Sequence, residues 1–243
     1  MQALLFFLFL FFSTFAAASP TFFPTVSCPE GWEIAHHSTL EEGVKIGFIQ
    51  SHKKFFTPSI TLTIEPVGNF ELHTYIEAVK NQYKQDHTNA YRHLGTLHTS
   101  IGSTPLIQID MKNQWGEIRI LQAICMYDGY ALIQTGVCLK KDFLKVHETF
   151  LEAFKSLNVF PSIFDSIDDS NFKNKTESLI SHWNTYIQDS ENDRATLLTS
   201  SHFQENLWKP YVHYVENQLA NKGSSWHFLA LRHVQESLLK ASK

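Results

Sequence analysis

Residues 120–139, ILQAICMYDGYALIQTGVCL, are two apolar runs joined by Asp128-Gly129. An Asp-Gly pair in this setting predicts a two-residue hairpin turn, because a type I′ turn needs a positive φ at both central residues. The turn pairs Tyr127 with Tyr130, and the rest of the register follows by counting outward. The stretch therefore predicts a long antiparallel hairpin.

Both faces of this hairpin are apolar enough to need cover. One face is a core face that also carries Gln122 and Thr135. The other, here called the mixed face, consists of Arg119, Leu121, Ala123, Cys125 and Tyr127 beside Tyr130, Leu132, Gln134, Gly136 and Cys138. Left in water, it would be an unusually large apolar patch for a monomer. We expect the amphipathic helices on the core face, and the mixed face buried under the segment before Cys28 or under helices after Asn171.

Two of the three cysteines lie in the hairpin, both on the mixed face. In the predicted register Cys125 and Cys138 are six residues apart along the ribbon, or roughly 20 Å at about 3.3 Å per residue. A disulfide needs Cα atoms within about 7 Å. We interpret both as small buried hydrophobic residues rather than a crosslink or a metal site. Any single bridge would have to use Cys28.

The amino-terminal residues resemble an export signal. Leu4–Phe15 is a short apolar block, and small residues follow it up to Ser19. The block is shorter than the roughly 20 apolar residues of a membrane span. We expect a signal peptide over residues 1–18, cut after Ala18, with an uncleaved anchor as the alternative. The mature chain would then be exported, periplasmic or secreted, without a transmembrane span.

Composition restricts the class of protein. The net charge is −4 and 43% of the residues are hydrophobic. A phosphate-tracking protein needs a basic face, so nucleic acid is not an expected partner. Three cysteines are too few for a disulfide scaffold, so a hydrophobic core must hold the fold.

The order of predicted elements indicates an α+β protein with a mainly antiparallel sheet flanked by helices. Short strands come first, a helix follows, then four strands joined by short turns, then a second helix. In SITLTIEP, Ser59, Thr61 and Thr63 alternate with apolar residues. The predicted strands are 31–37, 43–50, 59–66, 91–100, 105–115, 118–127 and 130–139, and the predicted helices are 72–83 and 143–157.

Four stretches in this order resemble the PsbP-like family, which includes Mog-type and DcrB-like domains. They are CPEGWEI from Cys28, SITLTIEP from Ser59, WGEIRILQAICMYDGYALIQTGVC from Trp115, and FKSLNVF ending at Phe160. The resemblance covers roughly Cys28 to Phe160. It implies a three-layer sandwich with an antiparallel sheet between helices, and a binding or assembly role. It carries no functional residues across.

The remaining chain has a different character. Residues 161–171 are polar and predict a linker, and three helical stripes follow, one of them starting at Pro210. The predicted organisation is a signal peptide at 1–18, an α+β domain at 19–160, a linker at 161–171 and a helical segment at 172–243. Its aromatic residues are interpreted as core in preference to a partner-binding surface: Trp183, Tyr186, Trp208, Tyr211, Tyr214 and Trp226.

Thirteen histidines raise the question of a metal site, but no His-Glu-x-x-His, Cys-x-x-Cys or His-x-His motif is present. His93 and His98 are five residues apart on one predicted strand and should face opposite sides. His147 falls in an apolar helical stripe and is interpreted as a residue at the edge of the core. The remaining candidates, interpreted as solvated polar residues, are His36 with His37, His213 with Glu216, and His233 with Glu236.

Nucleophile motifs are also missing. There is no Gly-x-Ser-x-Gly sequence, Ser103 lies in an expected turn, and both hairpin cysteines lie in mid-strand. Asn174 begins a glycosylation sequon, meaningful only in a eukaryote. We expect no catalytic, cofactor or metal site, and favour an exported, non-catalytic cell-envelope protein that binds a protein partner or assists its assembly. The alternatives are a secreted host-contact protein and a hydrolase using Cys or Ser with His.

Overall fold

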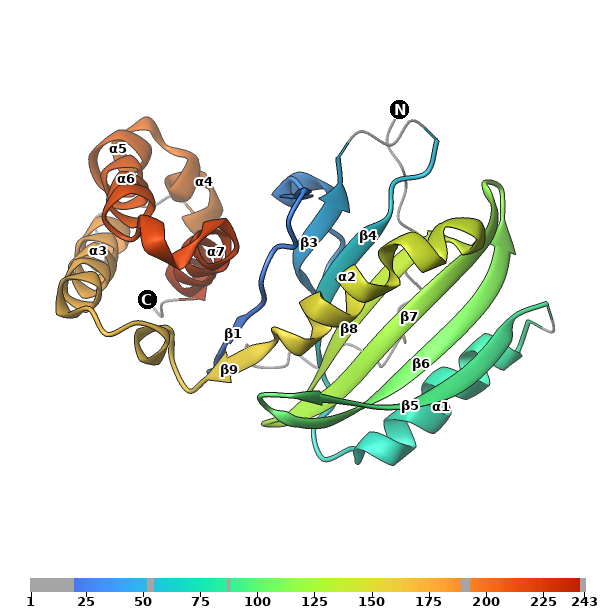
Figure 1. Cartoon of the computed structure of the whole chain (residues 1–243). Coiled ribbons are helices and arrows are strands. Elements are labelled where there is room, and N and C mark those ends of the chain that lie inside the picture. The colour runs from blue at the N-terminus through green and yellow to red at the C-terminus, as the bar shows by residue number, and fades with distance from the viewer. Residues whose placement is uncertain (1–19, 52–54, 87, 189–192, 241–243) are drawn as a thin grey trace. The chain divides into compact units, whose positions relative to one another are not determined.

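A computed structural model describes residues 20–51, 55–86, 88–188 and 193–240 (Figure 1). The predicted signal peptide, residues 1–18, lies outside them. The chain forms two compact units. The sheet unit contains Val26–Asn158, and the helical unit contains Thr21–Thr25 together with Val159–Lys243.

The sheet unit is built on one seven-stranded sheet with the order β2-β3-β4-β8-β7-β6-β5. Every neighbouring pair is antiparallel, which confirms the predicted α+β class. Strands β5 to β8 follow one another as the predicted meander. The strands are β2 (Trp32–Ile34), β3 (Val44–Gln50), β4 (Ser59–Pro66), β5 (Ala90–Thr99), β6 (Gly102–Asn113), β7 (Gly116–Tyr127) and β8 (Tyr130–Leu139).

The central hairpin has the predicted register. Asp128 and Gly129 adopt φ values of 48° and 76°, as a type I′ turn requires. Tyr127 pairs with Tyr130, and the pairing continues in step to the far end of the ribbon. The turn therefore determines which side chains share each face of β7 and β8.

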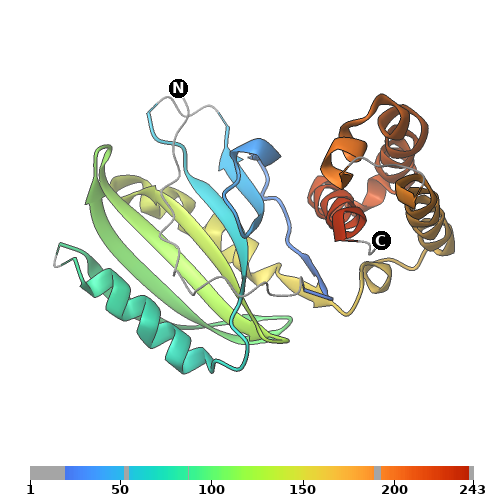
Figure 2. The ribbon, with the colours of Figure 1, turned by 180° about the vertical axis from the view of Figure 1, so that it is seen from behind.

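The two helices of the sheet unit cover opposite faces of the sheet. Helix α1 (Leu72–Lys84) lies on one side and α2 (Phe143–Lys155) on the other (Figures 1 and 2). Tyr75 and Val79 of α1 pack with the isoleucines of the core face. The expectation that both helices share the core face is therefore wrong, and the result is three layers.

The mixed face is covered by α2. A Cβ added at Gly136 would lie 2.6 Å from ring atoms of Phe150, and Gln134 Nε2 donates a hydrogen bond to the carbonyl of Ala153 at 3.2 Å. Leu121, Ala123, Cys125 and Leu132 are buried, as predicted. The predicted cover was wrong, because the second amphipathic helix supplies it from within the same unit.

The segment before Cys28 belongs instead to the helical unit. Strand β1 (Phe23–Thr25) pairs with β9 (Asn158–Phe160) in a two-stranded sheet. The Phe23 ring packs edge-on against Trp226, with ring centroids 6.3 Å apart, and against His233 at 5.5 Å. The first described strand of the chain is thus part of the core formed by its last helix.

The rest of the helical unit is a set of short helices around aromatic side chains. Trp183, Tyr211 and Trp226 are buried, and the Trp183 indole N–H donates to the carbonyl of Leu238 at 2.8 Å. Helix α3 begins at Ser170, inside the predicted linker, and α4 has no counterpart among the three predicted helical stripes. The helices are α3 (Ser170–Gln188), α4 (Arg194–Thr199), α5 (Ser201–Phe203), a π-helical turn (Gln204–Trp208), α6 (Lys209–Gln218) and α7 (Ser224–Lys240).

Within the described part of the chain, no helix combines the length and the apolar character needed to cross a membrane.

Candidate ligand-binding face

The cysteines are not placed for chemistry. All three are free thiols. Burial raises the pKa of Cys125 and that of Cys138 to about 12, so both are protonated at neutral pH. Cys28 Sγ donates to the carbonyl of Trp32 at 3.4 Å, and partial burial raises its pKa as well. Because the thiolate is the nucleophile and the metal ligand, none of the three has that character here.

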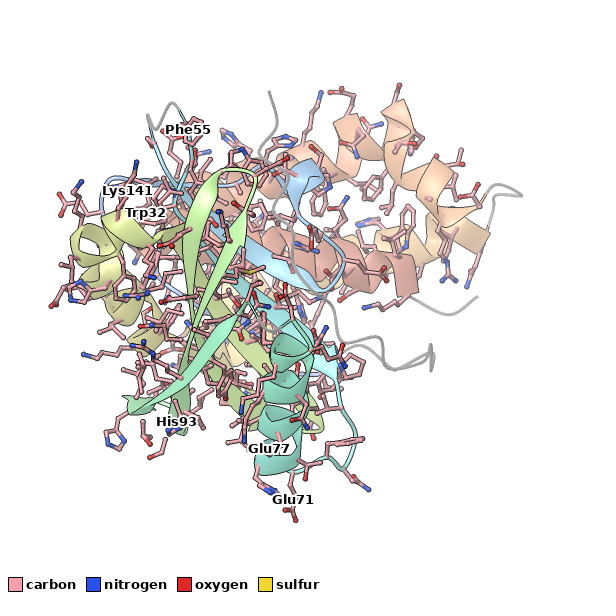
Figure 3. All side chains as sticks on the ribbon, turned by 90° about the vertical axis from the view of Figure 1, so that its right-hand side faces the viewer. Trp32, Phe55, Glu71, Glu77, His93 and Lys141 are labelled. Atoms are coloured by element: carbon pink, nitrogen blue, oxygen red, sulfur yellow. The ribbon has the colours of Figure 1, made fainter. Side chains whose placement is uncertain are left out.

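One prediction about the histidines is wrong. His93 pairs with Ile107 and His98 pairs with Ser103, with a bulge between His93 and Gly95. The extra residue reverses the alternation of side chains, so His93 and His98 share one face of β5. His93 is exposed on this outermost strand (Figure 3). Among the described residues, no group of three or more His, Cys, Asp or Glu side chains could hold a metal ion.

Ser103 and His98 do come together. Ser103 Oγ lies 3.1 Å from His98 Nδ1 across the exposed β5–β6 hairpin. A catalytic serine needs a third group that orients the histidine. No hydrogen bond joins His98 to a carboxylate in the described part of the chain, so this is a surface pair.

A charged cluster at the start of α2 is internally paired. Arg119 Nε donates to Asp110 Oδ1 at 2.6 Å, and the Arg119 guanidinium lies 4.7 Å from the centre of the Phe143 ring. Hydrogen bonding to Arg119 lowers the pKa of Asp110. Lys140 adds a second cation, 3.6 Å from Asp110. The charged side chains of this cluster pair with one another on the mixed face. The candidate site is therefore sought on the other face of the sheet.

A row of polar side chains crosses the α1 face of the sheet. Thr61 of β4 pairs with Thr135 of β8, and Thr135 pairs with Gln122 of β7. Directly paired residues of antiparallel strands point to the same face, and Ser59 joins them because it lies two residues before Thr61. We call Ser59, Thr61, Gln122 and Thr135 the polar row. All four are buried.

Three polar atoms of the row have no hydrogen-bond partner. They are Ser59 Oγ, Thr61 Oγ1 and Gln122 Oε1. The amide nitrogen of Gln122 donates a hydrogen bond to Thr135 Oγ1 at 3.3 Å, whereas the amide oxygen has no hydrogen-bond partner. A buried polar atom without a partner costs about 1–3 kcal/mol, and folded proteins rarely retain several together. The row therefore holds three buried polar atoms that the described part of the fold leaves unpaired.

Strand β4 adds a carboxyl group, Glu65, on the face of the row, and helix α1 adds two phenols, Tyr75 and Tyr83. The Tyr75 hydroxyl donates to Glu65 Oε2 at 2.6 Å. Burial raises the pKa of Glu65, and the hydrogen bond from Tyr75 opposes this rise. Burial also raises the pKa of Tyr83 to about 12, with an opposing hydrogen bond to Gln122. Both phenols are therefore protonated at neutral pH.

Apolar side chains frame the row on the same face. Ile120 and Val137 lie on one side of it, and Ile124 and Ile133 lie on the other. No lysine, arginine or histidine projects from this face of β4, β8 or β7. These apolar side chains are buried, and Tyr75 and Val79 of α1 pack with them.

Sequence reasoning identified the parts of this face but not their association. It placed Gln122 and Thr135 on the core face of the hairpin and recognised the alternation of Ser59 and Thr61. The missing step was the pairing of β4 with β8, which joins segments about 70 residues apart. A buried glutamine on an otherwise apolar face was the signal that could have led there.

No family model and no curated protein matches the chain. Among solved structures, LpqN of Mycobacterium tuberculosis, described as involved in cell envelope biogenesis, is 9% identical with a TM-score of 0.46, covering 58% of this chain and 84% of LpqN. The PsbP protein CyanoP of Synechocystis sp. PCC 6803 is 11% identical with a TM-score of 0.38, over 62% and 99% of the two chains. The Ran-binding protein Mog1p of Saccharomyces cerevisiae is 15% identical with a TM-score of 0.39, over 56% and 89%.

At these identities the likeness is one of fold and not of function. The α+β fold of this chain resembles, over the part that each comparison covers, that of the PsbP- and Mog-like proteins to which the sequence pattern points.

Proposed function

We propose that this chain is an exported, non-catalytic protein of the cell envelope that binds a partner or assists its assembly. The observation that carries the binding role is the polar row, in which Ser59 Oγ, Thr61 Oγ1 and Gln122 Oε1 are buried without hydrogen-bond partners. Hydroxyl and amide groups recognise a partner by hydrogen bonding.

The proposed export rests on the amino-terminal pattern. Residues 1–18 have the apolar block and the small residues of a cleavable signal. The proposed lack of catalysis is supported by the raised pKa values of Cys125 and Cys138, which keep both thiols protonated.

Crosslinking in the native envelope tests this function. The full-length chain with a carboxyl-terminal affinity tag is expressed in its own host, crosslinked, and purified from fractionated envelopes. We expect a specific partner that is recovered with the wild type and depleted with Thr61→Val. The exposed substitution Phe55→Ala, at a side chain that is 70% accessible, is the matched control. Recovery of the same background proteins with all three chains would contradict the proposal.

The hydrolase alternative has one supporting observation, the contact of Ser103 with His98 at 3.1 Å. Screening the purified protein against ester, amide and phosphate substrates tests it. Turnover that disappears in Ser103→Ala would establish the hydrolase in place of the binding protein. Fractionation of culture supernatant against envelope separates the second alternative, a secreted host-contact protein.

A further inference from the structure

We propose that the outer edge of β5 binds an extended, acidic segment of the partner protein, which pairs with β5 as an additional strand of the sheet. This inference rests on the proposed binding role but not on the polar row, and it names a second surface with the chemistry that would recognise it. Three properties of β5 carry it: the free backbone groups, the exposed side chains, and the charge along the edge.

The backbone of β5 is paired on one side only. Strand β5 is the last strand of the seven-stranded sheet, and β6 is its neighbour. In an antiparallel pair, every second residue of an edge strand points its N–H and C=O groups away from the neighbouring strand. Within the described part of the chain, no hydrogen bond joins the backbone of residues 91–98 to any element other than β6. The edge therefore offers donors and acceptors to an added strand, a known mode of peptide recognition.

The side chains of this edge are accessible, and Figure 3 shows His93 on the outer strand. Leu97 is the one buried residue of β5. The opposite edge of the sheet differs, because β2 has three residues and its Trp32 is buried. The long edge of the sheet is therefore the one open to a partner. Its exposed residues between Tyr91 and Thr99 are Arg92, His93, Leu94, Thr96 and His98.

The charge along the edge favours an acidic segment. From Ala90 to Gln108, which covers β5, its turn and the facing half of β6, the sequence has no Asp or Glu, and Arg92 is its one permanently charged residue. Arg92 takes part in none of the salt bridges of the described residues. A carboxylate on an added strand can pair with Arg92, whereas a lysine there, or the Arg92 of a second copy of this chain, would be repelled.

The bulge in β5 limits the length of the segment. The extra residue between His93 and Gly95 interrupts the regular spacing of the backbone groups. Bulges and charged side chains on an edge strand prevent indiscriminate pairing. A long apolar strand would meet both obstacles, because the bulge breaks its register and the Arg92 guanidinium would lose hydration against it. A short acidic segment that pairs with residues 90–93, on one side of the bulge, meets neither.

Titration of the isotope-labelled mature chain, residues 19–243, with synthetic peptides tests the proposal by NMR. The probe is the capped peptide Thr-Val-Glu-Val-Glu-Val, and Thr-Val-Lys-Val-Lys-Val is the control with the same backbone and opposite charge. We expect the acidic peptide to shift the amide signals of residues 90–93 saturably. The basic peptide should bind at least tenfold more weakly, which corresponds to about 1.4 kcal/mol.

A third peptide separates strand pairing from simple charge attraction. The acidic peptide with every backbone nitrogen methylated keeps both carboxylates but cannot donate a backbone hydrogen bond, so it should bind at least tenfold more weakly.

Substitutions of the protein test the role of Arg92. Arg92→Glu should reverse the preference between the acidic and basic peptides. Arg92→Gln should abolish the preference, and it keeps the test informative if a second carboxylate near Asp110 destabilises the fold. Lys141→Glu is the matched control, because it changes the net charge as Arg92→Glu does, at an exposed residue that Figure 3 places away from His93. It should leave the peptide preference unchanged.

Four results would overturn the inference: no saturable shift at residues 90–93, equal binding of the acidic and basic peptides, equal binding of the methylated and unmethylated peptides, or an unchanged preference in both Arg92 variants. If one of them is found while the envelope crosslinking still recovers a Thr61-dependent partner, the β5 surface is wrong and the proposed function stands. If the peptides behave as expected but the crosslinking recovers no specific partner, the edge binds acidic strands and the proposed envelope function is wrong.

Discussion

Phe23 is the side chain that ties the beginning of the described chain to its end, and Phe23→Ala tests that connection. It is 1% exposed, lies on β1, and contacts Trp226 and His233 of α7 edge-on. Truncation to alanine removes both ring contacts and leaves a cavity in the helical unit. Replacement of a fully buried Phe by Ala costs about 3–5 kcal/mol, and we expect a value in this range.

The loss should be confined to one unit. Strand β1 pairs with β9, and Thr21–Thr25 group with Val159–Lys243. The sheet unit keeps its own cover, α1 on one face and α2 on the other. We therefore expect Phe23→Ala to lower the unfolding midpoint of the helical unit and to leave that of the sheet unit unchanged.

The residues of the chain provide a separate probe for each unit. Cys28, Cys125 and Cys138 are its only cysteines, and all lie within Val26–Asn158. Thiol labelling along a urea gradient therefore reports the sheet unit. When Trp32 and Trp115 are replaced by Phe, tryptophan fluorescence reports the helical unit alone.

The control is Phe55→Ala, because that ring is 70% exposed and such a change is usually worth less than about 0.5 kcal/mol. A wild-type fluorescence midpoint in Phe23→Ala would refute the assignment of β1 to the helical unit. Equal shifts of the fluorescence and thiol midpoints would refute the independence of the two units.

Three further predictions concern the sheet unit. Gly136→Ala should lower the free energy of unfolding by about 1–3 kcal/mol, because its Cβ would overlap the Phe150 ring. In urea unfolding, adding Phe150→Leu to this variant should restore part of the lost stability. A wild-type midpoint for Gly136→Ala would contradict the packing of α2 on the mixed face. The raised pKa of Glu65 means that the folded state favours the protonated carboxyl, so stability present below the unfolded pKa is lost as pH rises through the folded pKa. Glu65→Gln should abolish this loss of stability, so the variant should become more stable relative to the wild type as the pH rises. Urea midpoints from about pH 4 to about pH 8 measure the difference, and parallel pH profiles of the two proteins would contradict the prediction. Cys125 and Cys138 should react slowly with a polar alkylating reagent at neutral pH until urea unfolds the chain, and rapid labelling of both native thiols would reopen the reactive-cysteine hypothesis.

Local signals determined much of the sheet. Asp128-Gly129 specifies a turn with two positive φ values, and a turn of known length determines the register of both strands that it joins. The incompatibility of Cys125 and Cys138 as a disulfide followed from that register alone. The mainly antiparallel class followed in the same way, because the predicted strands between residues 91 and 139 are joined by turns too short for a parallel crossover.

These local signals could not predict contacts between segments that are far apart in the sequence. The apolar stripes of α1 and α2 show which side of each helix is buried, but not which face of the sheet receives it, and both faces of the hairpin were apolar enough to accept a helix. A single inserted residue before Gly95 reversed the faces expected for His93 and His98, because side-chain alternation has a period of two. A glycine inside a strand pattern often marks such a bulge, so Gly95 was the signal for it.

The sequence by itself determined the hairpin, the meander and the α+β class, since each depends on residues close together in the chain. Only the tertiary structure decided the position of β1 and the existence of the polar row. Three residues of β1 are too few for a periodic pattern, and their place depends on pairing with β9. The row exists because β4 pairs with β8 and β8 with β7, so its unpaired hydroxyl and amide groups meet on one face only after the strands have assembled.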